Sequence, residues 1–456
     1  MSHSGSSGLV LACGLLTACA SLPQPANMSV APPAAAPAGN NWWRLYGDVA
    51  LNDLIAQGLS DNPDIHAAEA RTEALRAAIR EAKAASAASL SLAFTANDAR
   101  LAQASGLSTD PLQSSTRQAL AQLDWSPDLW GRGRAGQHAA YSDAQAARAD
   151  ADDARRRLAL SIVEGWIELG RLAACRELMR EILAARRSAL DIAQHRAAVG
   201  AEPASSIWPL EAQVETIAGQ ADRMDRSLAT ASDALAVAVG RSPGSQPLAP
   251  PHLDHLLLTS PRTDAGEASS LRPDVIAAAA RIRASKARVD QARAAFYPSL
   301  NLMGFVGLLR LDGQGFRGGG GEAAIDIPLL DAGRRRAALS ARQAERTVAE
   351  AEYRGVLLNA QGEVAQAMND LHAALADGKH KTGVVAANAG TLDWAVERHR
   401  VGVSNELEAL EAKVVWLESR IEAINLQAEA LLAHAALSAA TATMGEPGPR
   451  SPTYIP

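Results

Sequence analysis

The chain has 456 residues, enough for several ordinary domains or for one large repeat assembly. Aromatic residues make up only 4% of it, and the alanine-rich remainder favours long helices that pack closely. The formal net charge of −6 gives no reason to expect nucleic acid as a partner, and three cysteines, two of them within the first twenty residues, exclude a disulfide framework.

Residues 1–18 have the pattern of a signal peptide, because a short apolar stretch ends in small residues directly before Cys19. Leu16-Thr17-Ala18-Cys19 resembles the lipobox of bacterial lipoproteins, which would make Cys19 the acylated first residue of the mature protein. No Lys or Arg precedes the apolar stretch, so a buried cysteine in a degraded signal is the alternative. Residues 19–41 are rich in Pro and Ala and are interpreted as a flexible, lipidated tether.

A strand hairpin is predicted at about residues 89–126. Ser89 to Phe94 alternates polar and apolar residues, and so does Gln118 to Trp125. In the first of these strands the alternation puts Leu90 and Leu92 on one face, opposite the serines.

A helical hairpin follows at about residues 133–240. No proline occurs between Pro127 and Pro203, and apolar residues recur at helical spacing through the stretch. A helix of roughly 65 residues would be about 100 Å long, a length typical of coiled coils. Gly200, directly after Val199, predicts the point at which the chain reverses into a second helix.

The same order of elements recurs in the second half. A strand hairpin is expected at about residues 299–328, with Leu300 and Leu302 on its apolar face, and a helical hairpin at about 333–444 that reverses at Gly402. Residues 313–318 spell G-x-G-x-x-G, but a strand rather than a helix follows, so we interpret them as a loop and not as a nucleotide site.

The two halves also repeat each other in sequence. Asn62-Pro63-Asp64 recurs as Arg272-Pro273-Asp274, 210 positions further on, and Gly131-Arg132 recurs as Gly333-Arg334 after 202. The sequence therefore predicts a mainly α fold with β, built from two repeats at residues 42–250 and 251–444, with a tail at 445–456.

The predicted strands have a physical consequence. Four strands cannot close into a barrel, and an open sheet edge cannot lie in lipid. Because the smallest membrane barrels need about eight strands, several chains would have to pool theirs in a membrane. A soluble four-stranded sheet is the alternative.

The order of motifs resembles the TolC family of outer membrane efflux proteins, in its lipid-anchored NodT/OprM-like branch. The resemblance spans about residues 42–444 and rests on these segments: Asn62-Pro63-Asp64, Trp125-Ser126-Pro127-Asp128-Leu129-Trp130-Gly131-Arg132, Leu271-Arg272-Pro273-Asp274-Val275, Ala294-Ala295-Phe296-Tyr297-Pro298-Ser299-Leu300 and Ile327-Pro328-Leu329-Leu330-Asp331-Ala332-Gly333-Arg334.

The resemblance implies a homotrimer in the outer membrane of a Gram-negative bacterium. Three chains would give a 12-stranded β-barrel, whose apolar face, including Leu90, Leu92, Leu300 and Leu302, would meet lipid or neighbouring wall residues. The helical hairpins would form an α-barrel through the periplasm. The implied partners are a periplasmic membrane fusion (adaptor) protein and an inner-membrane pump of RND or MFS type.

The resemblance also implies a gate at the periplasmic tip, formed by carboxylates just after the second reversal. Glu408 and Glu411 fall on the acidic positions of the family motif and lie three apart, on one helix face. Threefold symmetry would gather them into a ring that attracts cations. The family usually has Asp at these positions and an aromatic residue at His399. A solvated helix face is the alternative.

The expected function is thus a passive exit duct for drugs or other small molecules in a tripartite efflux or export system. The alternative is a periplasmic coiled-coil scaffold lipoprotein without a conducting lumen. An enzyme is not expected, because the sequence has no C-x-x-C or H-E-x-x-H motif. No cofactor and no metal is expected.

Overall fold

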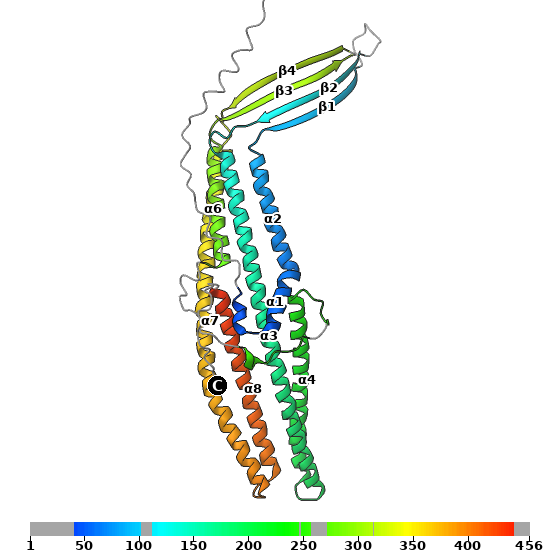
Figure 1. Cartoon of the computed structure of the whole chain (residues 1–456), viewed down its shortest axis with the longest axis vertical. Coiled ribbons are helices and arrows are strands. Elements are labelled where there is room, and N and C mark those ends of the chain that lie inside the picture. The colour runs from blue at the N-terminus through cyan, green and yellow to red at the C-terminus, as the bar shows by residue number, and fades with distance from the viewer. Residues whose placement is uncertain (1–40, 102–111, 246–247, 257–270, 313, 442–456) are drawn as a thin grey trace, which may run out of the picture. The chain divides into compact units, whose positions relative to one another are not determined.

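The computed structural model describes residues 41–101, 112–245, 248–256, 271–312 and 314–441 (Figure 1). Cys19, the signal peptide, all but the last residue of the tether and the C-terminal tail therefore lie outside the described residues. The elements of the first half are η1 (Trp42–Tyr46), α1 (Val49–Asp61), α2 (Pro63–Ala84), β1 (Ser89–Leu101), β2 (Leu112–Trp125), α3 (Arg132–Ala198), η2 (Ala204–Ser206) and α4 (Ile207–Ala238).

The second half has the same kinds of element in a similar order. They are η3 (Leu253–His255), α6 (Pro273–Ala294), β3 (Ser299–Leu311), β4 (Gln314–Asp326), α7 (Arg334–Arg400) and α8 (Glu406–Thr441). The helices α2 and α6 both have 22 residues, and α3 and α7 both have 67. Helix therefore dominates the described chain, with one sheet, as the sequence predicted.

Local chemistry fixes where the short helices begin. Asn62 caps α2 by accepting a hydrogen bond from the Asp64 amide at 2.8 Å, and Pro63 occupies the first helical position, where its missing N–H costs nothing. The Asn62 amide group also donates to the Ala238 carbonyl at the end of α4. One side chain thus joins the start of α2 to the end of α4.

Both long helices end at a glycine with a left-handed backbone. Gly200 follows α3 with φ of 73°, and Gly402 follows α7 with φ of 77°. The amides that follow bond back into the last turn, Ala201 to the Arg196 carbonyl and Val403 to the Arg398 carbonyl, both at 2.9 Å. This closure leaves the chain pointing backwards, so α4 and α8 return along α3 and α7.

The main core lies where α1, α3, α4 and α8 meet. The N-terminal η1 and α1 bury Trp42, Tyr46 and Ile55 against Trp166 of α3 and Leu431 of α8. The Tyr46 hydroxyl lies 2.9 Å from His434 Nδ1, and burial raises the pKa of this tyrosine. Two smaller clusters extend the packing, one between α7 and α8 and one between α3 and α8.

The four strands form one antiparallel sheet in the order β1-β2-β3-β4. Figure 1 shows the strands leaving and rejoining the helices at the same end, because α2 and α6 end there and α3 and α7 begin there. Within the described part of the chain, no helix is apolar over a length that could cross a membrane.

The loop interpretation of residues 313–318 is wrong. Gln314 to Gly321 belong to β4, which pairs with β3 over its whole length. Four consecutive glycines disguise the strand, since glycine has low strand propensity. The ring of Phe305 on β3 covers Gly320, where an added Cβ would lie 3.0 Å from the ring. An aromatic neighbour thus compensates for the missing side chain.

Candidate functional site

The second helix reversal holds the two glutamates that the sequence singled out. Both lie at the start of α8, where Asn405 caps the helix by accepting from the Glu408 amide at 3.0 Å. Acidic side chains are favoured there by the partial positive charge of the helix N-terminus. Local capping therefore gives Glu408 a fixed place directly after the turn.

Glu408 is paired within its own hairpin. The Arg398 guanidinium, in the last turn of α7, lies 2.9 Å from the Glu408 carboxylate. The same guanidinium stacks over the Trp394 ring at 4.5 Å from its centroid. The aromatic ring and the carboxylate thus hold one arginine between them, across the reversal.

Glu411 is paired with the other half of the chain. Its carboxylate lies 2.5 Å from the guanidinium of Arg186 on α3. Two residues further along α8, Lys413 lies 3.9 Å from Glu181, also on α3. Beside these pairs the apolar cluster of Ile182, Val414 and Leu417 packs α3 against α8. The tips of the two helical hairpins are therefore joined by charge and by packing.

These contacts change the charge expected at the tip. Two carboxylates and two guanidiniums, Arg398 and Arg186, leave no net charge in the set of four side chains. Sequence reasoning missed both arginines. Arg398 could have been found, because a hairpin that turns at Gly402 brings it opposite Glu408. Nothing in the sequence points to Arg186, which lies 225 positions from Glu411.

The first reversal has a similar but simpler arrangement. After Gly200, the carboxylate of Glu202 lies 3.1 Å from the guanidinium of Arg196 in the last turn of α3. Trp208, at the start of α4 and six residues after Glu202, is largely exposed to solvent. Each reversal therefore pairs an acid after the turn with an arginine before it.

The sheet register places the four predicted leucines on one face. Leu90 pairs with Leu123, Leu300 with Ile325, and Leu302 with Trp125, and directly paired residues share a face. Leu92, the fourth, pairs with Ala121, and the same face also carries Phe94, Val306 and Leu308. Leu90 is 76% exposed and Ile325 is 68% exposed. Where the strands join the helices, this face of the sheet is thus an apolar surface that the described chain leaves uncovered, whereas the far end of the same face carries the charged residues Asp98, Arg117, Arg310 and Arg317.

The opposite face of the sheet carries both polar and apolar side chains. It carries Ser91 opposite Gln122, Ser89 opposite Asp124, and Asn301, whose carbonyl oxygen accepts from the Ser126 hydroxyl at 2.6 Å. Larger apolar residues also occur on it, among them Met303, Phe305 and Leu309. Neither face therefore follows the alternation of polar and apolar residues over its whole length.

Two aspartates cap the long helices just below the sheet. Asp128 accepts from the Arg134 amide at 2.8 Å, and Asp331 accepts from the amides of Arg335 and Gly333 at 3.0 and 3.1 Å. Burial alone would raise the pKa of Asp128, but these backbone hydrogen bonds outweigh it and the pKa is lowered. The pKa of Asp331 is lowered chiefly by the Arg335 amide. Asp-Leu-Trp-Gly-Arg and Asp-Ala-Gly-Arg are thus capping motifs.

A buried ion pair network links the long helices further along. Arg272, which is 1% exposed, bonds Asp274 at 2.7 Å and Glu363 of α7 at 2.6 Å. Burial opposes the charge on Asp274, but hydrogen bonds from Arg272 outweigh it and lower the pKa of this carboxyl. On α3, Arg156 pairs with Asp153 at 2.7 Å, both buried. The network fixes where α6 begins against α7.

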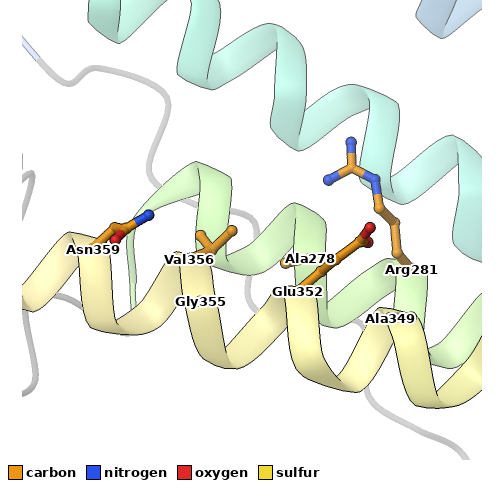
Figure 2. A pocket seen from close by; sticks show the side chains of 7 residues that line it. All are labelled: Ala278, Arg281, Ala349, Glu352, Gly355, Val356 and Asn359. Atoms are coloured by element: carbon orange, nitrogen blue, oxygen red, sulfur yellow. The ribbon is translucent and has the colours of Figure 1, made fainter.

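A shallow hollow of about 350 Å³ lies between α6 and α7. The residues that line it include the small residues Ala278, Ala349 and Gly355 (Figure 2). The Glu352 carboxylate is directed toward Arg281 at one end of it, and Arg281 itself bonds Asp150 of α3. Among the described residues no group of three acidic, histidine or cysteine side chains could hold a metal ion.

Known structures share this chain fold. The outer membrane protein VceC of Vibrio cholerae superposes with a TM-score of 0.76 at 28% identity, covering 89% of this chain and 98% of VceC. The outer-membrane channel OprN superposes with a TM-score of 0.79 at 23% identity, covering 89% of this chain and 92% of OprN. A four-stranded sheet carried on long helical hairpins is therefore a fold that the chain shares with these two proteins.

The chain belongs to the outer membrane efflux protein family, whose sequence profile matches residues 54–241 and 265–443. Outer membrane protein OprJ of Pseudomonas aeruginosa is 29% identical over 385 residues, which cover 82% of this chain and 80% of OprJ. Toluene efflux pump outer membrane protein TtgF of Pseudomonas putida is 28% identical over 381 residues, 82% of this chain and 79% of TtgF. The family resemblance seen in the sequence motifs is thus confirmed.

Proposed function

We propose that the chain is the outer membrane exit duct of a tripartite efflux or export system, which conducts drugs or other small molecules passively. The observation that carries this proposal is the uncovered apolar face of a sheet whose edge strands, β1 and β4, have no strand paired to their outer edges among the described residues. An apolar sheet with open edges is stable in lipid only after the edges are paired. Membership of an efflux family supports the same conclusion.

Three copies of the chain pair those edges. β1 and β4 both have 13 residues, so β4 of one copy can pair with β1 of the next along its whole length. Three sheets of four strands then close into a 12-stranded barrel, with Leu90, Leu92, Leu300 and Leu302 facing lipid. The exposed face of α7, with Val348, Leu358 and Trp394, is available to the neighbouring copy. The hollow of Figure 2 offers a seat there for a side chain of that copy.

The halves of the chain have equivalent roles in this duct. Residues 42–250 and 251–444 form two repeats, each of which supplies one strand hairpin to the barrel and one helical hairpin to a periplasmic α-barrel. Residues 1–18 are a signal peptide, and Cys19 is the lipid attachment site of a tether that ends near residue 41. The partners are a periplasmic adaptor protein and an inner-membrane pump of the RND or MFS type, which supplies the energy.

The tip of the helical hairpins is the gate. In the closed state Arg186 holds Glu411 and Arg398 holds Glu408, and opening requires α8 to move away from α3. The reversal glycines Gly200 and Gly402 let the hairpins turn without backbone strain and take no part in the ion pairs of the gate. Because the set of four charged side chains is neutral, selectivity depends on which pairs remain when the gate opens.

A scaffold without a lumen is the second candidate. It accounts for the long helices but not for an apolar sheet face, which a soluble scaffold would have to cover. The deciding experiment reconstitutes the full-length purified protein in planar lipid bilayers. The duct gives discrete conductance steps and trimers that dissociate only on heating of outer membrane fractions. Monomeric protein without conductance would reject the duct in favour of the scaffold.

A further inference from the structure

Exposed apolar side chains gather in the loops that connect the sheet to the helices. Leu329 and Leu330, between β4 and α7, are 90% and 93% exposed. In the loops before α3 and β3, Trp130 and Tyr297 are each about half exposed and stack on one another with centroids 5.0 Å apart. The indole N–H of Trp130 donates to the Pro298 carbonyl at 2.6 Å. Stacking and this hydrogen bond hold Trp130 and Tyr297 in place. These two side chains, with Leu329 and Leu330, make up an apolar group in the loops at the helix end of the sheet, and the described chain leaves each of them about half exposed or more.

The apolar face of the sheet ends beside these loops. Trp125 and Ile325 belong to that face, and Ile327, just after β4, is 56% exposed. Exposed apolar side chains are therefore found both at the strand ends and in the loops next to them. Where the surface ends, the polypeptide changes from strand to helix, and α3 and α7 begin.

Positively charged side chains follow directly after these loops, at the starts of α3 and α7. Arg132, Arg334 and Arg336 lie in the first turns of α3 and α7 and are exposed. Within the described residues these three form no salt bridge, whereas Arg134 pairs with Asp128 and Arg335 pairs with Asp331. Asp128 and Asp331 are thus already engaged by their own neighbours. The three other guanidiniums form no ion pair in the described chain, although Arg334 also acts on the Asp331 carboxylate through its charge.

Apolar and basic residues in this order match the chemistry of a phospholipid surface. Tryptophan and tyrosine favour the boundary between hydrocarbon and headgroups, and leucine favours the hydrocarbon side. Arginine binds phosphate through two parallel hydrogen bonds. An anionic leaflet also attracts unpaired basic residues that lie at its surface. A soluble protein surface provides no reason to expose two consecutive leucines beside three unpaired arginines.

We propose that this group forms a binding surface for the anionic phospholipids of the leaflet nearest the helices. Trp130, Tyr297, Leu329 and Leu330 enter the headgroup boundary, and Arg132, Arg334 and Arg336 bind lipid phosphates. The inference rests on the proposed function in one respect, since it takes the sheet to lie in a membrane. It adds the lipid class and the residues that recognise it, which fix the depth at which the sheet is held.

The test replaces Arg132, Arg334 and Arg336 together by Gln in the full-length protein. Wild type and variant are reconstituted in phosphatidylethanolamine vesicles, with brominated phosphatidylglycerol or brominated phosphatidylethanolamine as quencher of tryptophan fluorescence. The ratio of the two quenching constants measures the preference for the anionic lipid. We expect wild type to prefer phosphatidylglycerol, and the preference to fall about fivefold or more in the variant.

A matched control replaces Arg148, Arg187 and Arg354 by Gln. These arginines are also exposed and form no salt bridge in the described part of α3 and α7, but at 1.5 Å per residue they lie roughly 25 Å or more from the helix starts. The control should keep the wild-type preference. A third variant with Lys at positions 132, 334 and 336 keeps the charge and should retain most of it. In wild type the preference should also weaken with added salt.

Several outcomes would overturn the proposal. An unchanged lipid preference in the Gln variant would do so, and so would an equal loss in the control. Trimers that dissociate while the lipid preference persists would assign the arginines to a contact between copies instead. A wild-type preference that is insensitive to salt rejects the surface without any variant. Conductance is recorded in the same vesicles, because its absence in wild type would reject the proposed function separately.

Discussion

The guanidinium of Arg186 on α3 lies 2.5 Å from the carboxylate of Glu411 on α8, although 225 positions separate the two residues. The Glu411 side chain is 60% exposed, so the pair contributes only about 0–1 kcal/mol. Such a contact orients the helix tips but is broken at small cost. A gate that a partner protein opens would need contacts of this kind, which hold the closed state but can be broken at small cost.

Arg186→Gln and Glu411→Gln should each raise the open probability of single channels. If the pair contributes about 1 kcal/mol to the closed state, the increase is about fivefold. The exchanged double variant, Arg186→Glu with Glu411→Arg, should return toward wild type. Arg400→Gln is the matched control, because its partner Glu397 lies on the same helix. An exchanged variant as open as either single variant would remove this pair from the gate.

Glu408→Gln with Glu411→Gln should lower the cation selectivity of the open channel. The substitutions leave Arg398 and Arg186 without their carboxylates, so the tip gains two positive charges per chain. Reversal potentials measured under a salt gradient should therefore shift toward anions. Adding Arg398→Gln to the double variant should reverse part of the shift. Reversal potentials equal to those of wild type would make both glutamates part of a solvated helix face.

Leu90→Lys should prevent assembly, whereas Ser91→Lys should be tolerated. The two residues are neighbours in β1 but lie on opposite faces of the sheet. A lysine on a lipid-facing position costs about 2–4 kcal/mol near the middle of a bilayer and about 0–1 kcal/mol near its surface, where Leu90 lies at the start of β1, so the effect depends on three copies each carrying the lysine. The yield of heat-modifiable trimers in the outer membrane measures the effect. Equal yields from both variants would contradict the assignment of the faces.

The sequence predicted the helices well because their signals are local. The absence of proline from Pro127 to Pro203, together with a glycine at the turn, was enough to predict α3 and the reversal at Gly200. Residues 314–321 were missed for the same reason, since a strand that depends on Phe305 of its neighbour has no local signal of its own. At the tip, a motif singles out Glu408 and Glu411, but Arg186 reaches Glu411 only through the packing of α3 on α8.

The Arg272 network should make stability depend on acid. In the folded chain the pKa of Asp274 is lowered, since hydrogen bonds from Arg272 outweigh the effect of burial. The stabilisation is therefore complete above the unfolded pKa of about 4 and is lost as the pH falls through the lower folded value. The unfolding temperature of wild type should fall below about pH 4 more steeply than that of Asp274→Asn.

The exposed Asp370 of α7 provides the control for this measurement. It forms no ion pair in the described part of the chain, so Asp370→Asn should keep the wild-type pH profile. The difference between wild type and Asp274→Asn should itself shrink as the pH falls, because protonation removes the same charge as the substitution. A difference that stays constant from neutral to acidic pH would show that Asp274 does not act through its ionisation.

The two 67-residue helices differ in how much they bury, and this difference sets how often each one opens. α3 packs against α2, α4, α6 and α8, while α7 packs mainly against α6 and α8 and buries few side chains: Ala349, Ala360, Val364, Ala367, Leu371, Ala374 and Ala395. Amide hydrogens of α7 should therefore exchange with deuterium sooner than those of α3 in a single chain, and slow down once copies associate. Exchange in the second helical hairpin is thus the measurement that reports most directly on the proposed association of copies.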